Sequence, residues 1–229
     1  MRELLSIGIL PLLLTLGAYQ IGLLLQKKLK SALVNPVLIS VVLLLGFMAL
    51  TGLENETYQG GMAKFSWLLT PATVCLAIPM YQHFQTLRRN LPAVLAGIAA
   101  GTISCLMMVL LWATVFRIDR QLALSLLPKS VTSAIGVPLT EMVGGVSAVT
   151  TAAIILTGIL ANMLGTVFCK LFRLTDPVAQ GVAFGTAGHV IGTARASQMS
   201  ELAGAVSSFS LVVTGLLTAI VFPLIAKLC

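Results

Sequence analysis

The chain has 229 residues, of which 58% are hydrophobic and only 9% are charged. A soluble domain carries about 25% charged residues, so this composition excludes a soluble domain and predicts an integral membrane protein. The net charge of +7 comes from Lys and Arg that mostly lie in short loops or at segment ends. Charges in such places set membrane orientation, and we therefore expect no nucleic-acid partner.

Long apolar runs predict a bundle of membrane helices. A helix needs about 20 mostly apolar residues to cross the hydrocarbon core of a bilayer. We therefore predict an all-α polytopic membrane protein with about 7–8 membrane segments, two of them interrupted or re-entrant, in a single transmembrane domain over residues 1–229. The segments cover residues 4–25, 33–50, 65–84, 91–116, 122–140, 146–169, 178–199 and 205–228.

The first loops carry the charges that predict orientation. Lys27, Lys28 and Lys30 follow the first segment, and Arg88 and Arg89 follow the third. Loops rich in Lys and Arg stay in the cytoplasm, so the N-terminus is predicted to lie outside the cytoplasm. The first apolar run is too long for a signal peptide, and the sequence lacks an organelle-targeting pattern. A bacterial inner membrane is therefore the predicted location.

The fifth segment differs from an ordinary lipid-facing span. It holds Pro128, Lys129 and Pro138; proline breaks a helix interior, and a lysine at membrane depth is costly. A broken helix exposes N–H groups with partial positive charge, and Lys129 adds a full charge, so the segment suits an anion. The alternative is a lysine that reaches the interface beside a kinked structural helix. If the segment re-enters rather than spans, Lys170 and Arg173 fall on the cytoplasmic side, which the charge rule favours.

A polar stripe runs along the fifth segment if it is helical. Its members share one face at helical spacing and are Lys129, Thr132, Ser133, Gly136 and Thr140. Such a stripe must face a cavity, because each unpaired polar group in lipid costs several kcal/mol. The segment also echoes residues 71–79, with a two-residue insertion. An internal repeat and a coincidence in a biased composition explain this echo equally well.

The seventh segment combines a face of small residues with a polar face. On a helical wheel its glycines and its polar side chains lie on adjacent sides; these are Gly181, Gly185, Gly188 and Gly192, and Thr186, His189 and Thr193. Arg195 follows within a turn. His189 suits a carboxylate contact or a proton relay, and Arg195 suits a bidentate carboxylate contact. The alternatives are helix packing for His189 and an interface position for Arg195.

Two acidic residues, Glu141 and Glu201, each follow an interrupted segment. Each is a candidate proton carrier or a partner for Lys129 or Arg195, and the alternative is a solvated loop residue. The sequence contains no nucleophile elbow, phosphate-binding loop, dinucleotide fingerprint or metal-ligand spacing. We therefore expect no enzyme activity, no catalytic residues, no metal and no cofactor.

Three motifs of the chain lie at residues 69–79, 127–133 and 185–195. They resemble the LrgB/CidB family of antiholin-like membrane proteins, and the resemblance extends over nearly the whole chain. It implies a single LrgB-like transmembrane domain over residues 1–229 with one of two functions. Bacterial members are described as regulators of murein hydrolase export and cell lysis that act with a small LrgA/CidA-like membrane protein. The plastid relative is a glycolate/glycerate transporter, and some bacterial relatives are linked to pyruvate uptake.

We expect a secondary transporter of a small monocarboxylate or 2-hydroxy acid, with the lysis regulator and a channel as alternatives. A carboxylate site needs a cation, N–H donors and hydroxyl groups, whereas a regulator needs no cation beside interrupted helices. The predicted substrate-binding residues are Lys129, Ser130, Thr132, Ser133, Thr186, His189, Gly192, Thr193 and Arg195, and the proton-coupling candidates are His189, Glu141 and Glu201. The expected partners are the lipid bilayer, a small carboxylate anion, an LrgA/CidA-like membrane protein and a second copy of the chain in a homodimer.

Overall fold

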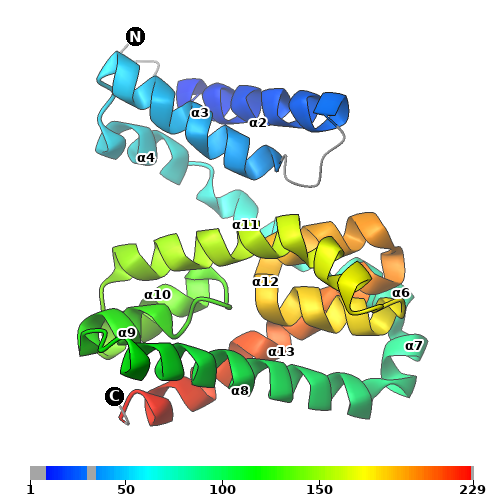
Figure 1. Ribbon diagram of the computed structural model, residues 1–229. Helices are drawn as coiled ribbons and strands as arrows, with labels where there is room; N and C mark the ends of the chain where they lie inside the picture. Colours follow the sequence, from blue (N-terminus) through cyan, green and yellow to red (C-terminus); the bar gives the residue numbers. More distant parts are fainter. Residues whose placement is uncertain (1–8, 30–34, 228–229) are drawn as a thin grey trace. The chain divides into compact units, whose positions relative to one another are not determined.

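The computed structural model describes residues 9–29 and 35–227, which form helices joined by short connections (Figure 1). The all-α prediction is confirmed, since no strand occurs in these ranges. Lys30 and the parts of the predicted segments at residues 4–8, 33–34 and 228 lie outside the description. The chain divides into two compact units, Met1–Cys75 and Leu76–Cys229. The single domain over the whole chain stays a prediction.

In the first unit two caps set the ends of α3, and a hydroxyl contact joins α2 to α4. Its elements are α2 (Ile9–Leu29), α3 (Pro36–Thr51), α4 (Asn55–Ala63), the 3-10 helix η1 (Ser66–Leu68) and α5 (Leu69–Cys75). The Asn35 side chain accepts a hydrogen bond of 2.8 Å from a backbone N–H at the start of α3. α3 ends at Gly52, whose φ of 66° suits glycine. The Tyr58 hydroxyl of α4 lies 2.6 Å from Thr15 Oγ1 of α2.

The second unit is built on three 25-residue helices, α8, α11 and α13. Its elements are α6 (Ala77–Gln82), α7 (Phe84–Arg89), α8 (Leu91–Val115), α9 (Arg120–Leu126), α10 (Ser133–Met142), α11 (Ser147–Leu171), α12 (Pro177–Met199) and α13 (Glu201–Ile225). Val94 and Val206 share one apolar cluster, and Val109 and Phe222 share another. The first pair lies in the N-terminal halves of α8 and α13 and the second in their C-terminal halves, so these two helices run in the same direction.

α9 and α10 form a helical hairpin, which we call the first hairpin. At its base, Gln121 Nε2 donates to the Gly144 carbonyl (3.1 Å), and the Val146 N–H donates to Ser125 Oγ (2.7 Å). The end of α10 therefore returns to the start of α9. The non-helical residues 127–132 form its tip. The predicted interruption of the fifth segment is confirmed, and the segment turns back instead of running straight.

α12 also turns back on itself and forms the second hairpin. His189 has a non-helical backbone, with φ 41° and ψ −137°. A methyl group at Gly192 would come within 2.5 Å of the Phe184 carbonyl oxygen, although the two residues are eight positions apart. A straight helix would separate them by about 12 Å. The chain therefore reverses at His189, which is the tip between the arms 177–188 and 190–199, and the turn is visible at the α12 label in Figure 1.

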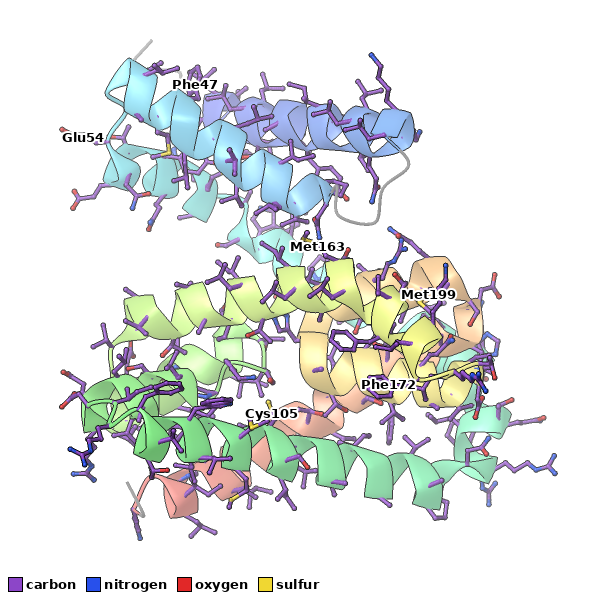
Figure 2. The ribbon with its side chains drawn as sticks, in the orientation of Figure 1. Phe47, Glu54, Cys105, Met163, Phe172 and Met199 are labelled. Atoms are coloured by element: carbon purple, nitrogen blue, oxygen red, sulfur yellow. The ribbon has the colours of Figure 1, made fainter. Side chains whose placement is uncertain are left out.

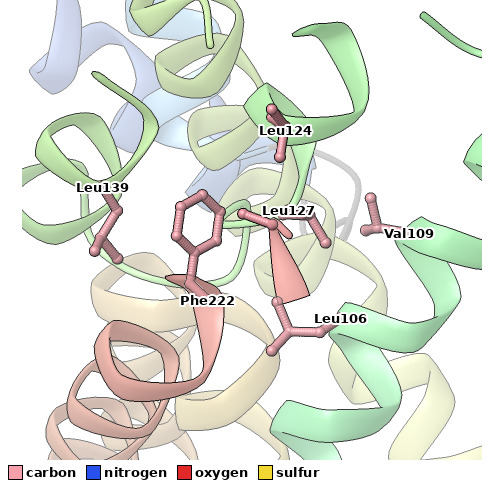
Figure 3. Close-up of a cluster of buried hydrophobic side chains, with 7 residues drawn as sticks. Leu106, Val109, Leu124, Leu127, Leu139 and Phe222 are labelled. Carbon is pink, nitrogen blue, oxygen red and sulfur yellow. The ribbon is translucent and has the colours of Figure 1, made fainter. Parts of the chain in front are cut away.

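The two hairpins enter the second unit from opposite ends. In the first hairpin, Leu124 and Leu139 pack around Phe222 at the C-terminal ends of α8 and α13 (Figure 3). In the second, Val178 and Val182 pack in the cluster at the N-terminal ends of the same helices. Each hairpin thus runs from its own end of the unit toward the middle, and α11 connects the two bases.

Four of the described helices are long and apolar enough to cross a membrane, namely α2, α8, α11 and α13. The number rises to five if the bent pair Asn55–Ala63 and Ser66–Gln82 is counted as one span. α3 is shorter, with 16 residues, and the two hairpins turn back. The higher predicted number of segments and the internal repeat stay predictions.

Candidate functional site

A cavity of about 540 Å³ lies between α8, α11, α12 and the tip of the first hairpin. Its wall is mostly apolar and includes Leu160, Leu164 and Phe184. Few polar side chains line it. Lys129 and Ser130 come from the hairpin tip, and Thr157, Cys105 and Cys169 come from the surrounding helices. A mostly apolar cavity of this size with a few polar groups is typical of a small-molecule site.

The tip of the first hairpin is non-helical because of Pro128. Proline has no N–H to donate, and its ring clashes with the preceding turn of a helix; α9 ends at Leu126, although Leu127, the residue before the proline, still has helical φ and ψ of −54° and −48°. The chain then makes tight turns, with hydrogen bonds from Lys129 N to Leu126 O (3.2 Å) and from Val131 N to Pro128 O (3.3 Å). This irregular backbone brings Lys129 to the cavity.

Lys129 is the cation of the cavity, and a thiol is its hydrogen-bond partner. Lys129 Nζ donates to Cys105 Sγ over 3.1 Å, and Ser130 Oγ lies 2.9 Å from the same sulfur. In Figure 2 the Cys105 side chain points from α8 toward the side where α11 lies. Among the described residues, none that lines the cavity is acidic, and Lys129 forms no ion pair. The ammonium charge is therefore not neutralised inside the cavity.

A small compartment of about 10 Å³ adjoins this group. It shares Cys105 and Ser130 with the large cavity and is also lined by Thr102 of α8 and Thr214 of α13. Both threonine hydroxyls are buried and lack a hydrogen-bond partner within the described part of the chain. A buried unpaired hydroxyl costs about 1–3 kcal/mol. Two unsatisfied hydroxyls thus lie next to Ser130, with room for about one small polar group.

His189, at the tip of the second hairpin, is engaged with α11. It is 4% exposed, and its Nε2 lies 2.9 Å from the Ile154 carbonyl oxygen. A carbonyl only accepts, so Nε2 carries the proton in this bond. The Asn162 side chain donates to the Ile191 carbonyl (3.0 Å), just beyond the break in α12. Thr193 Oγ1 donates to the His189 carbonyl (2.9 Å). The second tip is therefore tied to its surroundings by side-chain hydrogen bonds.

Both hairpins meet α11 at Ile154. The Ile154 carbonyl receives the His189 contact from the second hairpin. Its side chain reaches the first hairpin, where a methyl group at Gly136 would come within 2.8 Å of Ile154 Cδ1. Gly158, one turn further along α11, leaves room for the His189 ring, because a methyl group there would come within 2.6 Å of it. One helix thus positions the ends of both interrupted segments.

Of the predicted substrate-binding residues, Lys129 and Ser130 line the large cavity. The others do not line it. Thr132 is half-buried and Ser133 is exposed at the start of α10. Thr186 packs against Gly101 of α8, its buried hydroxyl unpartnered by any described residue.

The remaining predicted residues lie in the second hairpin, at the end of α10 or at the start of α13. Gly192 lies against Phe184, Thr193 Oγ1 lies 2.8 Å from Ser207 Oγ, and Arg195 Nη1 donates to Gln198 (3.0 Å). The two acidic candidates are exposed. Glu141 accepts a hydrogen bond from Ser147 Oγ (2.8 Å), and Glu201 Oε2 lies 3.9 Å from His83 Nε2. The structure therefore does not bring Arg195, Glu141 or Glu201 to the wall of the cavity.

Sequence reasoning missed Cys105, Thr157, Thr102 and Thr214. Each lies in a long apolar helix, where a thiol or hydroxyl is ordinarily a packing residue. No spacing within the chain connects Cys105 with Lys129, because their contact joins different elements. Only the folding of the first hairpin against α8 brings them together.

Comparison with known proteins assigns most of the chain to one family. The model of the LrgB-like family matches residues 15–228. No solved structure matches the chain.

Proposed function

Because the chain belongs to the LrgB-like family and holds a lysine without an acidic partner in an apolar cavity, we propose that it is a secondary transporter of small monocarboxylates or 2-hydroxy acids. The observation that carries the proposal is the position of Lys129. An ammonium group in an apolar environment is costly unless it is paired. A carboxylate substrate supplies that pair, and it displaces only the weak thiol contact with Cys105.

The cavity fits the rest of such a substrate. Leu160 and Leu164 provide an apolar wall for a short carbon chain, and Ser130 lies next to the cation. A hydroxyl at the carbon beside the carboxylate would reach toward the compartment lined by Thr102 and Thr214, whose hydroxyls are unpartnered within the described chain. The site thus offers a cation, an apolar wall and hydroxyl partners in one place.

The arrangement of the hairpins suits alternating access. Transporters place their sites near the middle of the membrane between interrupted helices, and they open them by moving one part of the fold against another. Here the tip of the first hairpin lines the cavity with Lys129 and Ser130, and the second hairpin lines it with residues 183, 184 and 187. Proton coupling by His189, Glu141 or Glu201 would act through these movements, because none of the three lines the cavity.

The proposal also includes the location, orientation and protein partners of the chain. We place it in a bacterial inner membrane with its N-terminus outside the cytoplasm, as a homodimer that also contacts a small LrgA/CidA-like membrane protein. A role as antiholin-like regulator of murein hydrolase export is the alternative. It requires that partner and makes no use of a cation in a cavity.

Uptake by reconstituted protein tests the proposal. Liposomes containing the full chain should accumulate labelled glycolate, glycerate or pyruvate, and Lys129→Gln should abolish most of this uptake. Lys170→Gln is the matched control, because Lys170 is an exposed lysine at the end of α11 and does not line the cavity. If the wild-type protein moves none of these acids, the regulator is the better function. If Lys129→Gln and Lys170→Gln transport equally well, the cavity is not the site.

A further inference from the structure

We propose that the open end of the first hairpin carries a binding site for an anionic phospholipid. The site is a groove of about 310 Å³ formed by α9, α10 and the end of α13. It shares no lining residue with the cavity that holds Lys129. The proposal concerns a lipid partner of the protein and is independent of the transported substrate.

The wall of the groove is apolar and built from core residues. Leu124, Leu139 and Phe222 line it and are 3%, 8% and 0% exposed, respectively. The same three side chains pack together in the cluster of Figure 3, so the groove is the outer side of a packed core. An acyl chain matches this groove, because it would cover apolar surface such as that of Met142, which lines the groove and is 74% exposed, without leaving a polar group unpaired.

Two cations stand at the edge of the groove. Arg120 is the first residue of α9, and Lys227 follows the end of α13. Both are exposed, and neither forms an ion pair with any residue that the structure describes. Arg and Lys at helix ends commonly reach toward lipid headgroups one at a time. Here two of them, from different elements, converge on one apolar groove.

Two carboxylates near this end are not among the residues that line the groove, and neither forms an ion pair with Arg120 or Lys227. Asp119 caps α9 by accepting a hydrogen bond from the Gln121 N–H (2.9 Å). Glu141 accepts one from Ser147 Oγ (2.8 Å). Arg117, which follows α8, adds a third positive charge outside the groove. The charges of the groove itself are therefore positive only, and they favour an anion.

The position along the helices matches the headgroup region. α8 and α13 are candidate membrane spans that run in the same direction and end at Val115 and Ile225. Arg120 and Lys227 follow these ends, so their charges lie where the apolar spans stop. Basic pockets beside membrane helices bind anionic headgroups in this way. Free phosphate would use the two cations but not the apolar wall, so a phospholipid fits the groove better.

Competition between two lipids in native mass spectrometry tests the site. The purified full-length protein is offered equal amounts of phosphatidylglycerol and phosphatidylcholine with identical acyl chains. We expect the wild-type protein to retain phosphatidylglycerol in preference. Each cation near the surface contributes about five-fold to the binding of an anionic lipid. Arg120→Gln combined with Lys227→Gln should therefore bring the ratio of the two bound lipids close to one.

Arg117→Gln is the matched control, because it removes an exposed cation from the same end without touching the groove. It should leave the ratio nearly unchanged. The proposal is overturned if the double variant keeps the wild-type preference, or if Arg117→Gln lowers it as much as Arg120→Gln does. It is also overturned if inorganic phosphate at millimolar concentration displaces the bound lipid completely, because the apolar wall would then contribute nothing.

Discussion

The first hairpin turns over the six non-helical residues 127–132, whereas the second reverses at the single residue His189. The first tip presents a cation to a cavity, and the contact that holds the cation is a thiol. The second tip presents an imidazole to the backbone of α11, and the carbonyl beyond its break is satisfied by Asn162. Both tips carry an ionisable side chain at a helix break.

The difference lies in how well each polar group is already satisfied. His189 has a full hydrogen bond to the Ile154 carbonyl and little exposed surface, so ligand binding would cost that bond. Lys129 has a weak acceptor and no negative charge beside it, so ligand binding gains an ion pair. A polar residue at a helix break thus fixes the fold when its hydrogen bonds are already made, and it is available to bind a ligand when they are not.

The largest expected effect distinguishes Lys129 from Arg195, the two cations that were predicted from the sequence to bind the anion. Lys129→Gln should weaken binding of the transported acid about 30-fold or more, because loss of one partner of a shielded charge pair costs at least about 2 kcal/mol. Arg195→Gln should lower it by less than ten-fold, since Arg195 does not line the cavity. The concentration dependence of uptake into liposomes measures both. Equal losses would place both cations on the substrate.

The next effect tests whether the His189 ring holds the second tip rigidly in place. Gly158→Ala would place a methyl group within 2.6 Å of the His189 ring, which is fixed by its bond to Ile154. Overpacking of this kind costs about 1–3 kcal/mol, and thermal unfolding in detergent should show a Tm several degrees lower. Gly46→Ala is the control, because a methyl group there meets nothing within 4 Å. A similar Tm for both variants would mean that the ring yields easily.

A smaller effect separates the two tips by stability alone. His189→Gln removes the ring that bonds to Ile154 and should lower the Tm by a few degrees, because a buried hydrogen bond contributes about 0.5–1.5 kcal/mol. Lys129→Gln should leave the Tm at or above the wild-type value, since it removes a charge that has no ionic partner among the described residues. The opposite order of the two Tm values would mean that Lys129 fixes the fold and that His189 does not.

The smallest effect concerns the compartment beside the first tip. Thr102→Val and Thr214→Val replace buried hydroxyls that are unpartnered within the described chain, so we expect little change or a slight rise in Tm. Thr140→Val, the matched control, removes a hydroxyl that lies 2.9 Å from Thr150 Oγ1 and should lower the Tm. Uptake of glycolate relative to acetate should fall about three-fold in the first two variants, for the loss of one hydrogen bond. An unchanged ratio would leave the compartment without a role in recognition.

The first tip could be found from the sequence because its chemistry conflicts with its setting. A lysine and two prolines within one apolar run cannot form an ordinary span, and the structure breaks the helix there. Whether the fifth segment spans the membrane or turns back could be decided only from the contact at the base of the hairpin, where the Gln121 side chain donates to the Gly144 carbonyl. That contact joins residues that no local pattern pairs.

The second tip shows why helical spacing failed. Thr186, His189 and Thr193 share a face only if the helix continues through them. The reversal at His189 sends Thr186 toward Gly101 of α8 and Thr193 toward Ser207 of α13. The sequence located the break, since glycines and polar residues concentrate there. It did not reveal the change of direction, which depends on the backbone of one residue.

The two contacts of Ile154 bear on how a membrane would stay sealed. A carrier must keep at least one of its two gates closed, because ions would otherwise leak through it. In the proposed transporter the two hairpins would be these gates, and Ile154 of α11 contacts both of them: its carbonyl oxygen lies against His189 of the second hairpin, and its side chain lies against Gly136 of the first. A shift of α11 that loosened one contact would then disturb the other, so Ile154 would couple the two gates.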